Sequence, residues 1–233
     1  MSAFPQDSAV VLVHGAWADG SCWANVILPL RAQGLNVMCA PIPLTSLSDD
    51  IAALCRAFRR IRGPLVLVGH AYAGAVIGAA NDARVRSLVY IAALAPDEGE
   101  TVAKVFYRAE PHPEAPKLVP DADGLVWMPE DGFRRAVAHK APMEQTNIMA
   151  AVQRPIALRC IEEPAPAPAW KSKPSWYLLA EEDRMISPAT QQFMARRMNA
   201  SVRSCRVDHS PMYTAPDLVT AVILEAARES LSR

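Results

Sequence analysis

The feature that most constrains the fold is a turn between an apolar run and a segment of small residues. The run Pro64–Val68 is followed by Gly-His-Ala-Tyr-Ala-Gly at 69–74 and then by the small, apolar segment Ala75–Ala80. This order predicts a strand, a sharp turn and a helix, the arrangement of a nucleophile elbow with serine at its middle position. Ala71 stands there instead. The sequence therefore predicts a hydrolase scaffold that lacks its nucleophilic oxygen.

Short apolar runs alternate with helical patterns along the rest of the chain. We expect strands at Ala9–Val13, Asn36–Ala40, Leu65–Val68, Val85–Ala92, Ser175–Leu179 and Val202–Val207. These runs lack polar alternation, which is typical of strands covered on both faces. Helices are expected over Leu47–Ile61, from a Ser187 N-cap to about Met198, and over Ala215–Ser230. The predicted fold class is α/β, the α/β-hydrolase fold with a mainly parallel, doubly wound sheet.

Residues 96–174 differ in composition from the rest of the chain, and we call them the cap segment. Twelve of the 20 prolines lie there, and no strand is expected before Ser175. We expect short helices over Glu130–Lys140 and Met143–Val152. A stretch of this length is too long for an idle loop in a compact domain. The sequence therefore predicts a lid inserted between two parts of one core, 1–95 and 175–233.

Charge and cysteine content exclude several classes of function. The 24 basic and 24 acidic residues cancel, so neither a nucleic-acid partner nor a membrane surface is expected. The five cysteines are scattered without a Cys-x-x-Cys pair, which argues against a disulfide framework or a zinc site and favours a cytoplasmic location. We expect no metal or organic cofactor. The expected partner is a small-molecule ester, and the oligomeric state is left open, with a homodimer as one option.

Two further residues complete the chemistry that an elbow requires. Asp183 follows the expected strand at Ser175–Leu179, and His209 follows the one at Val202–Val207. The chain order of nucleophile, acid and histidine is that of α/β-hydrolases. Because the carboxyl ends of parallel strands meet at one edge of the sheet, we expect Ala71, Asp183 and His209 to form a catalytic site there.

Two backbone amides are candidates for an oxyanion hole. Ala16 lies in the turn after the first strand, and Tyr72 directly follows the centre of the elbow. Neither role depends on a side chain. His14 and His70 flank turns, and we interpret them as structural. The candidate substrate-binding residues are Trp17, Ser21, Trp127, Met128 and Met212.

Five motifs carry a resemblance to a known family. They are Val11–Trp17, Leu67–Gly74, Ala92–Asp97, Glu182–Ile186 and Asp208-His209. The chain resembles the plant methylesterases and hydroxynitrile lyases of the α/β-hydrolase superfamily, together with their small bacterial relatives. The resemblance implies a nucleophile at position 71, and it supports Asp183, His209 and the Ala16 and Tyr72 amides in the roles given above.

Two positions distinguish the branches of that group. The lyases have a threonine where this chain has Gly15, and a lysine directly after the catalytic histidine, where it has Ser210. The chain therefore looks like the esterase branch. This implies a Ser-His-Asp carboxylic-ester hydrolase acting on a small, fairly apolar ester, inactive or nearly so because of Ala71.

Ala71 has more than one interpretation. It is either an inactivating replacement in a serine hydrolase or a natural residue of a protein with another function. In the second case the chain is a non-catalytic ligand-binding protein, or an enzyme that uses a His–Asp dyad for proton transfer. The dyad enzymes of this superfamily are of the lyase or the cofactor-independent dioxygenase type.

Overall fold

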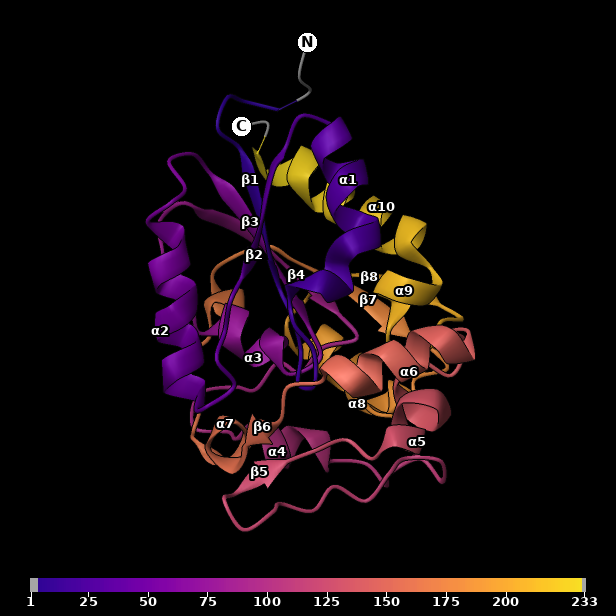
Figure 1. Ribbon diagram of the computed structural model, residues 1–233. Helices are drawn as coiled ribbons and strands as arrows, with labels where there is room; N and C mark the ends of the chain where they lie inside the picture. The colour runs from indigo at the N-terminus through magenta and orange to yellow at the C-terminus, as the bar shows by residue number, and fades with distance from the viewer. Residues whose placement is uncertain (1–3, 232–233) are drawn as a thin grey trace.

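A six-stranded parallel sheet forms the centre of the protein. The computed structural model describes residues 4–231, and the strands follow the order β2-β1-β3-β4-β7-β8 (Figure 1). Their bounds are β1 Ala9–Val13, β2 Asn36–Ala40, β3 Leu65–His70, β4 Val85–Ile91, β7 Ser175–Ala180 and β8 Ser201–Cys205. Every neighbouring pair is parallel. The predicted α/β-hydrolase fold class is confirmed.

Side chains of the central strands are buried on both faces of the sheet. In β1, Ala9, Val11 and Val13 belong to one hydrophobic cluster, and Val10 and Leu12 belong to the cluster on the opposite face. Successive side chains of a strand point to opposite faces, so an all-apolar strand requires two covering layers. The absence of polar alternation in the sequence has this physical cause.

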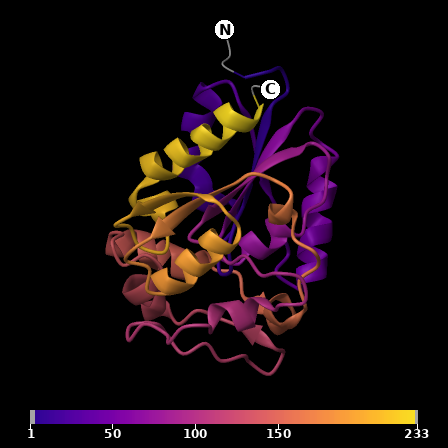
Figure 2. The same cartoon turned by 180° about the vertical axis from the view of Figure 1, so that it is seen from behind.

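Helices supply the two layers. They are α1 Ala24–Ala32, α2 Leu47–Phe58, α3 Ala73–Gly78, α8 Pro188–Arg197, α9 Pro211–Thr214 and α10 Pro216–Leu231, with a 3₁₀ turn at Gly20–Trp23. α2, α3 and α8 pack on one face, and α1 and α10 on the other (Figures 1 and 2). The Ser187 N-cap of α8 is confirmed, since its hydroxyl accepts the Ala189 amide. α1 was not among the expected helices, and it contains Pro29.

The cap segment lies between β4 and β7. Its elements are α4 Val102–Phe106, β5 Leu125–Val126, α5 Glu130–Gly132, a π-helical turn Phe133–Val137, α6 Met143–Val152, β6 Ile156–Ala157, α7 Leu158–Glu162 and a 3₁₀ turn Ala169–Lys171. They gather at the end of the sheet away from the chain termini (Figure 1). The expected helix over 130–140 changes to π-helical geometry at Phe133 and ends at Val137. The expectation of no strand was wrong, because strands of two residues are too short to show a hydrophobic period.

Polar contacts, among them the following, tie the cap segment to the core on both sides of the elbow. Arg154 donates to the backbone oxygens of Ile42 and Pro43, beyond β2. On the other side, the Lys140 amide donates to Asp208 Oδ2, next to His209. The cap segment is thus held against the loops on both sides of the elbow.

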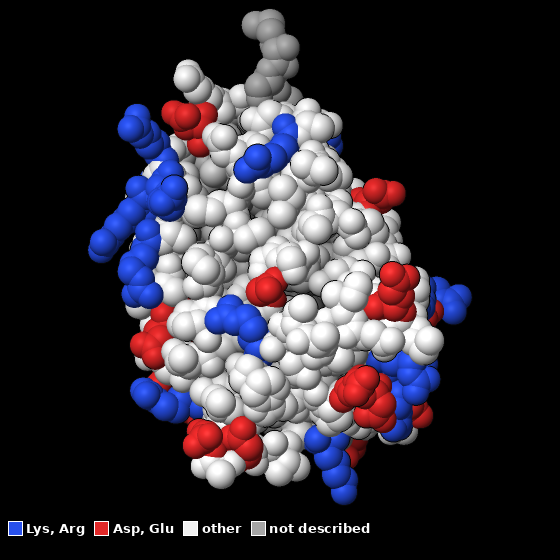
Figure 3. All heavy atoms as spheres, in the orientation of Figure 1, with Lys and Arg blue, Asp and Glu red and all other residues white. Residues whose placement is uncertain are grey.

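The charged side chains of the surface are scattered in sign. Figure 3 shows basic residues along the α2 edge and a largely uncharged area between that edge and the opposite side. Within residues 4–231, none of the helices is long and apolar enough to cross a membrane.

Candidate active site

The elbow after β3 has the backbone geometry that its sequence predicts. Ala71 has φ 49, a conformation that is costly for a residue with a Cβ. Its carbonyl accepts the amides of Gly74 and Leu94, which fixes the turn. A Cβ at Gly69 would lie 2.8 Å from the Ala73 carbonyl oxygen, and one at Gly74 would lie 2.3 Å from that of Leu94. The two glycines are therefore required for this turn to form.

The structure brings Asp183 and His209 together beside the elbow. His209 Nδ1 lies 2.8 Å from Asp183 Oδ2, and both side chains are buried. The other carboxylate oxygen accepts the amides of Met185 and Ile186 at 2.7 and 2.9 Å. Nε2 of His209, at the opposite edge of the ring, has no partner in the described part of the chain. His209 and Ala71 line the same cavity.

Gln191 of α8 also forms a hydrogen bond to this carboxylate, a contact that the sequence does not predict. The side chain is fully buried, and its Nε2 donates to Asp183 Oδ2 and to the Ile186 carbonyl, both at 2.8 Å. Its Oε1 accepts the Ala180 amide at 3.0 Å, at the end of β7. Gln191 thus joins the strand that precedes Asp183 to the carboxylate itself. The sequence does not predict this role, because nothing in it distinguishes the buried Gln191 from the adjacent Gln192, which is exposed.

The Ala16 and Tyr72 amides are both available for an incoming oxygen. Among residues 4–231, neither N–H has a hydrogen-bond acceptor, and both residues line the cavity that contains Ala71. A Cβ at Gly15 would lie 3.0 Å from the Cβ of Ala71. A residue with a Cβ would therefore fit only if its neighbours gave way by a few tenths of an ångström. The geometry is suitable for an oxyanion hole.

The cavity itself is apolar and has a volume of about 240 Å³. Its walls come from the core and from the cap segment, and among the lining residues Glu162 is the only one with a formal charge at neutral pH. The indole N–H of Trp17 lines the cavity but donates to the Val126 carbonyl at 2.9 Å, so it is not free for a ligand. Such walls favour an uncharged, apolar ligand with few polar atoms.

Two of the five predicted substrate-binding residues line the cavity, and three do not. Trp17 and Met212 are lining residues. Ser21 is exposed in the 3₁₀ turn before α1. Trp127 is 47% exposed and donates to Asp121, and Met128 is buried in a separate cluster of the cap segment. These three residues lie outside this cavity, so the structure adds no support for their predicted role: Ser21 and Trp127 lie at the surface, and Met128 packs in the core of the cap segment.

Two histidines and one cysteine beside the site are buried. Burial lowers the pKa of His70 well below its ordinary value, and its Nε2 lies 2.7 Å from the His209 carbonyl oxygen. Burial likewise lowers the pKa of His14, whose Nδ1 lies 2.9 Å from the Gly15 oxygen. Both therefore support turns as neutral rings. Burial also raises the pKa of Cys22, which keeps this lining residue a thiol and argues against a replacement nucleophile.

Comparisons with known proteins agree with this geometry. The model of the alpha/beta hydrolase family matches residues 10–222. A carbendazim hydrolyzing esterase from Nocardioides sp. (strain SG-4G) is 27% identical over 169 residues, which cover 66% of this chain and 68% of that protein. A pyrethroid hydrolase from Sphingobium faniae JZ-2 has a similar structure, with a TM-score of 0.81 at 21% identity over 95% of this chain and 98% of that one. A variant of tomato methylketone synthase I, complexed with β-ketoheptanoate, gives a TM-score of 0.78 at 18% identity over 95% and 98% of the two chains. The chain belongs to the alpha/beta hydrolase family and has an esterase-type scaffold.

Proposed function

We propose that the protein is a carboxylic-ester hydrolase of the Ser-His-Asp type whose nucleophile position is occupied by Ala71. It binds a small, fairly apolar ester and hydrolyses it very slowly or not at all. One observation carries the proposal. Ala71 has the positive φ of an elbow (49), and it lines the same cavity as His209, whose ring is bound to Asp183. This is the arrangement of a serine hydrolase apart from a single oxygen atom.

The geometry assigns a step to each group once a serine stands at position 71. His209 Nε2 takes the proton of the hydroxyl, and Asp183 holds the imidazole in the tautomer that can accept it. The hydroxyl oxygen bonds to the ester carbonyl carbon, and the Ala16 and Tyr72 amides donate to the developing oxyanion. The methyl group of Ala71 cannot form that bond. Hydrolysis by the chain as it stands is expected to fall by several powers of ten.

The cavity narrows the class of ester. No lysine or arginine is among its lining residues, so a ligand carboxylate would enter without a charge partner and beside Glu162. Burying such a charge is unfavourable. We therefore expect neutral aryl or short alkyl esters to bind, and esters that carry a free carboxylate to bind poorly.

The Gly15 contact favours the esterase over the hydroxynitrile lyase branch. The hydroxynitrile lyases that the chain resembles have threonine at this position. A Cβ here would lie 3.0 Å from Ala71 and 3.1 Å from Nδ1 of His70. A threonine side chain would therefore fit only if the loop after β1 or its neighbours shifted by a few tenths of an ångström.

The test is to install the missing oxygen. Ala71→Ser should gain at least about 1000-fold in hydrolysis of p-nitrophenyl butyrate over the parent chain. It should also show burst kinetics and react covalently with a fluorophosphonate probe. Adding His209→Ala should remove both properties while leaving the elbow intact. An Ala71→Ser variant that is inert on a broad panel of neutral esters would refute the proposal.

A second candidate function is proton transfer by the Asp183–His209 dyad without acyl transfer. The observation that favours it is that Nε2 of His209 is unpartnered within residues 4–231, beside a cavity that contains no nucleophilic hydroxyl at position 71. The tomato methylketone synthase structure contains a β-keto acid, and its neutral methyl ester is a suitable test compound because the cavity has no charge partner for a carboxylate. In this case His209→Ala abolishes an activity of the parent chain that Ala71→Ser leaves unchanged. Tight binding of a neutral ester by the parent chain, with no turnover by either variant, would instead indicate a binding protein.

A further inference from the structure

Asp50 of α2 is a buried carboxylate that lies outside the cavity. It binds Tyr72, the residue that follows the centre of the elbow. Its side chain has no exposed surface, and its Oδ1 accepts the Leu44 amide at 2.7 Å. Its Oδ2 accepts the Tyr72 hydroxyl at 2.6 Å and the Cys160 thiol at 3.6 Å. Within the described residues no lysine, arginine or histidine pairs with it. Because burial of an unpaired carboxylate is unfavourable, a group of this kind calls for an explanation.

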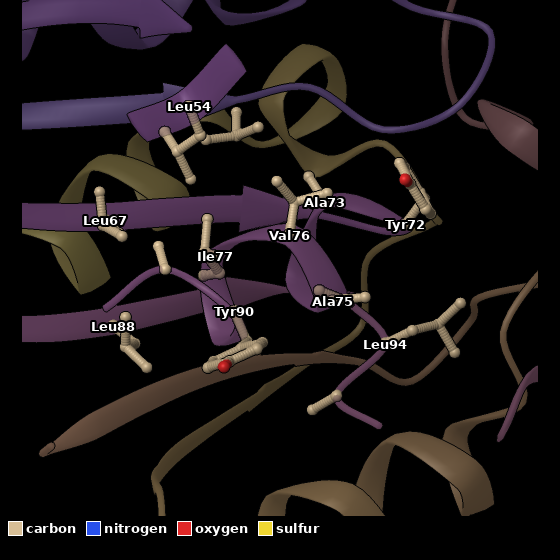
Figure 4. Close-up of a cluster of buried hydrophobic side chains, with 14 of the residues drawn as sticks. Leu54, Leu67, Tyr72, Ala73, Ala75, Val76, Ile77, Leu88, Tyr90 and Leu94 are labelled. Atoms are coloured by element: carbon tan, nitrogen blue, oxygen red, sulfur yellow. The ribbon is translucent and has the colours of Figure 1, made fainter. Parts of the chain in front are cut away.

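The bond to Tyr72 is the shortest of the three contacts. Burial and the neighbouring Asp50 charge raise the pKa of the Tyr72 hydroxyl far above its ordinary range, so it remains a donor. A short O–H···O⁻ bond is charge-assisted and roughly twice as strong as a neutral one. In Figure 4, Tyr72 lies at one end of the buried cluster that also contains Leu54 of α2 and Val76 of α3. The ring is thus held by packing along its length and by Asp50 at its tip.

Fixing the ring also fixes the backbone to which it is attached. Tyr72 directly follows the strained Ala71, and its own N–H has no acceptor among the described residues. The Gly74 and Leu94 amides hold the Ala71 carbonyl and so the orientation of the Ala71–Tyr72 peptide, whereas a shift of the Tyr72 ring would move the Tyr72 Cα and displace its N–H. The Asp50 carboxylate lies in the first turn of α2, whose Ser46 N-cap accepts the Asp49 amide. The Tyr72 ring is therefore anchored to a rigid element.

We propose that Asp50 is a positioning residue of the oxyanion hole, which holds the Tyr72 ring and thereby the position of the Tyr72 N–H. The role rests on the proposed function, because this position matters only if an oxyanion forms beside the amide. Sequence spacing alone does not show the pair, since 22 positions separate the two residues.

The test uses the Ala71→Ser chain as its background. Asp50→Asn preserves the shape but changes the acceptor, and Tyr72→Phe removes the hydroxyl. Cys160→Ala is the matched control, because it removes another donor from the same Asp50 oxygen and leaves the bond between Tyr72 and Asp50 in place. The readouts are kcat and KM for p-nitrophenyl butyrate and the affinity for an aryl trifluoromethyl ketone. That ketone bonds to the installed serine oxygen and places an oxyanion in the hole.

Asp50→Asn and Tyr72→Phe should each lower kcat by about 10- to 100-fold, less than the loss of a whole oxyanion donor, with KM nearly constant. The affinity for the ketone should fall by the same factor as kcat/KM, since both report binding of the oxyanion. The Cys160→Ala control should stay within about twofold of its background on every readout.

Three results would overturn the positioning role. The first is kcat that neither variant changes, and the second is a loss of kcat with undiminished ketone affinity. The third is failure of both variants to fold by circular dichroism, which would assign the pair to stability alone. If Ala71→Ser itself shows no esterase activity, the proposed function fails and this role fails with it. If Ala71→Ser is active and insensitive to both changes, only the positioning role fails.

Discussion

Replacing the buried Gln191 by methionine tests whether this side chain supports the loop that carries Asp183. Methionine has a similar length but removes all three hydrogen bonds of the amide. The Ala180 N–H and the Ile186 carbonyl are then left buried without this partner, and each such group costs about 1–3 kcal/mol. Asp183 keeps its bonds to Met185, Ile186 and His209, so its loss is smaller. Burial of the thioether offsets about 1 kcal/mol, which leaves a net destabilisation of about 3 kcal/mol.

Urea denaturation followed by circular dichroism measures the difference in the free energy of unfolding between Gln191→Met and the parent, and thermal melting measures the difference in Tm. A destabilisation of 1 kcal/mol shifts Tm by about 2–4 °C in a domain of this size, so Gln191→Met should melt about 6–12 °C below the parent. Gln192→Met is the matched control, because it makes the same chemical change at the next, exposed position of α8. It should change the free energy of unfolding by no more than about 0.5 kcal/mol. Two variants of equal stability would show that the Gln191 bonds do not support the loop.

Two further predictions concern the elbow and its neighbours. Gly74→Ala should destabilise the protein by at least about 2 kcal/mol, because the new Cβ would lie 2.3 Å from the Leu94 oxygen. In the control Gly78→Ala, in the same helix, the new Cβ meets nothing closer than the Tyr90 hydroxyl at 3.2 Å, so the free energy of unfolding should change by no more than about 1 kcal/mol. Equal effects in urea titrations would contradict this. Burial lowers the pKa of His70, so the unfolded chain binds the proton more tightly and the free energy of unfolding should fall as the pH drops below about 6.5. His70→Gln should reduce that fall between pH 7 and pH 5, and an unchanged pH dependence would rule out His70 as its source.

The sequence predicts one edge strand of the sheet, β2, better than the other, β8. The bounds of β1 and β2 coincide with the expected ones, because β1 is apolar throughout and β2 nearly so. β8 spans Ser201–Cys205, whereas the expected strand was Val202–Val207. It lies at the edge of the sheet, and Val202 is 50% exposed. The expected strand runs too far because the buried Val207 belongs to the loop that follows β8, so the apolar pattern continues past the end of the strand.

The sequence predicts some of the site residues and not others. Ala71, Asp183 and His209 follow β3, β7 and β8, so chain order and strand ends suffice to bring them to one edge. Asp50 and Gln191 act from the interior of helices, and their roles depend on which face of the helix is buried. Periodicity gives that face for α2, but it does not distinguish a buried carboxylate with a partner from a polar residue in the first turn of a helix.

The preserved elbow geometry at Ala71 does not depend on the side chain at that position. Its carbonyl is held by the Gly74 and Leu94 amides, and the turn is possible because positions 69 and 74 lack a Cβ. These contacts would impose the same positive φ on serine or alanine. On its own, a retained turn is therefore weak evidence that position 71 still has a chemical role. The groups that have no partner in the described part of the chain are stronger evidence, because an imidazole nitrogen and two amides left free beside an apolar cavity contribute nothing to folding. Their hydrogen-bonding capacity is used only when a polar atom of a ligand is bound there.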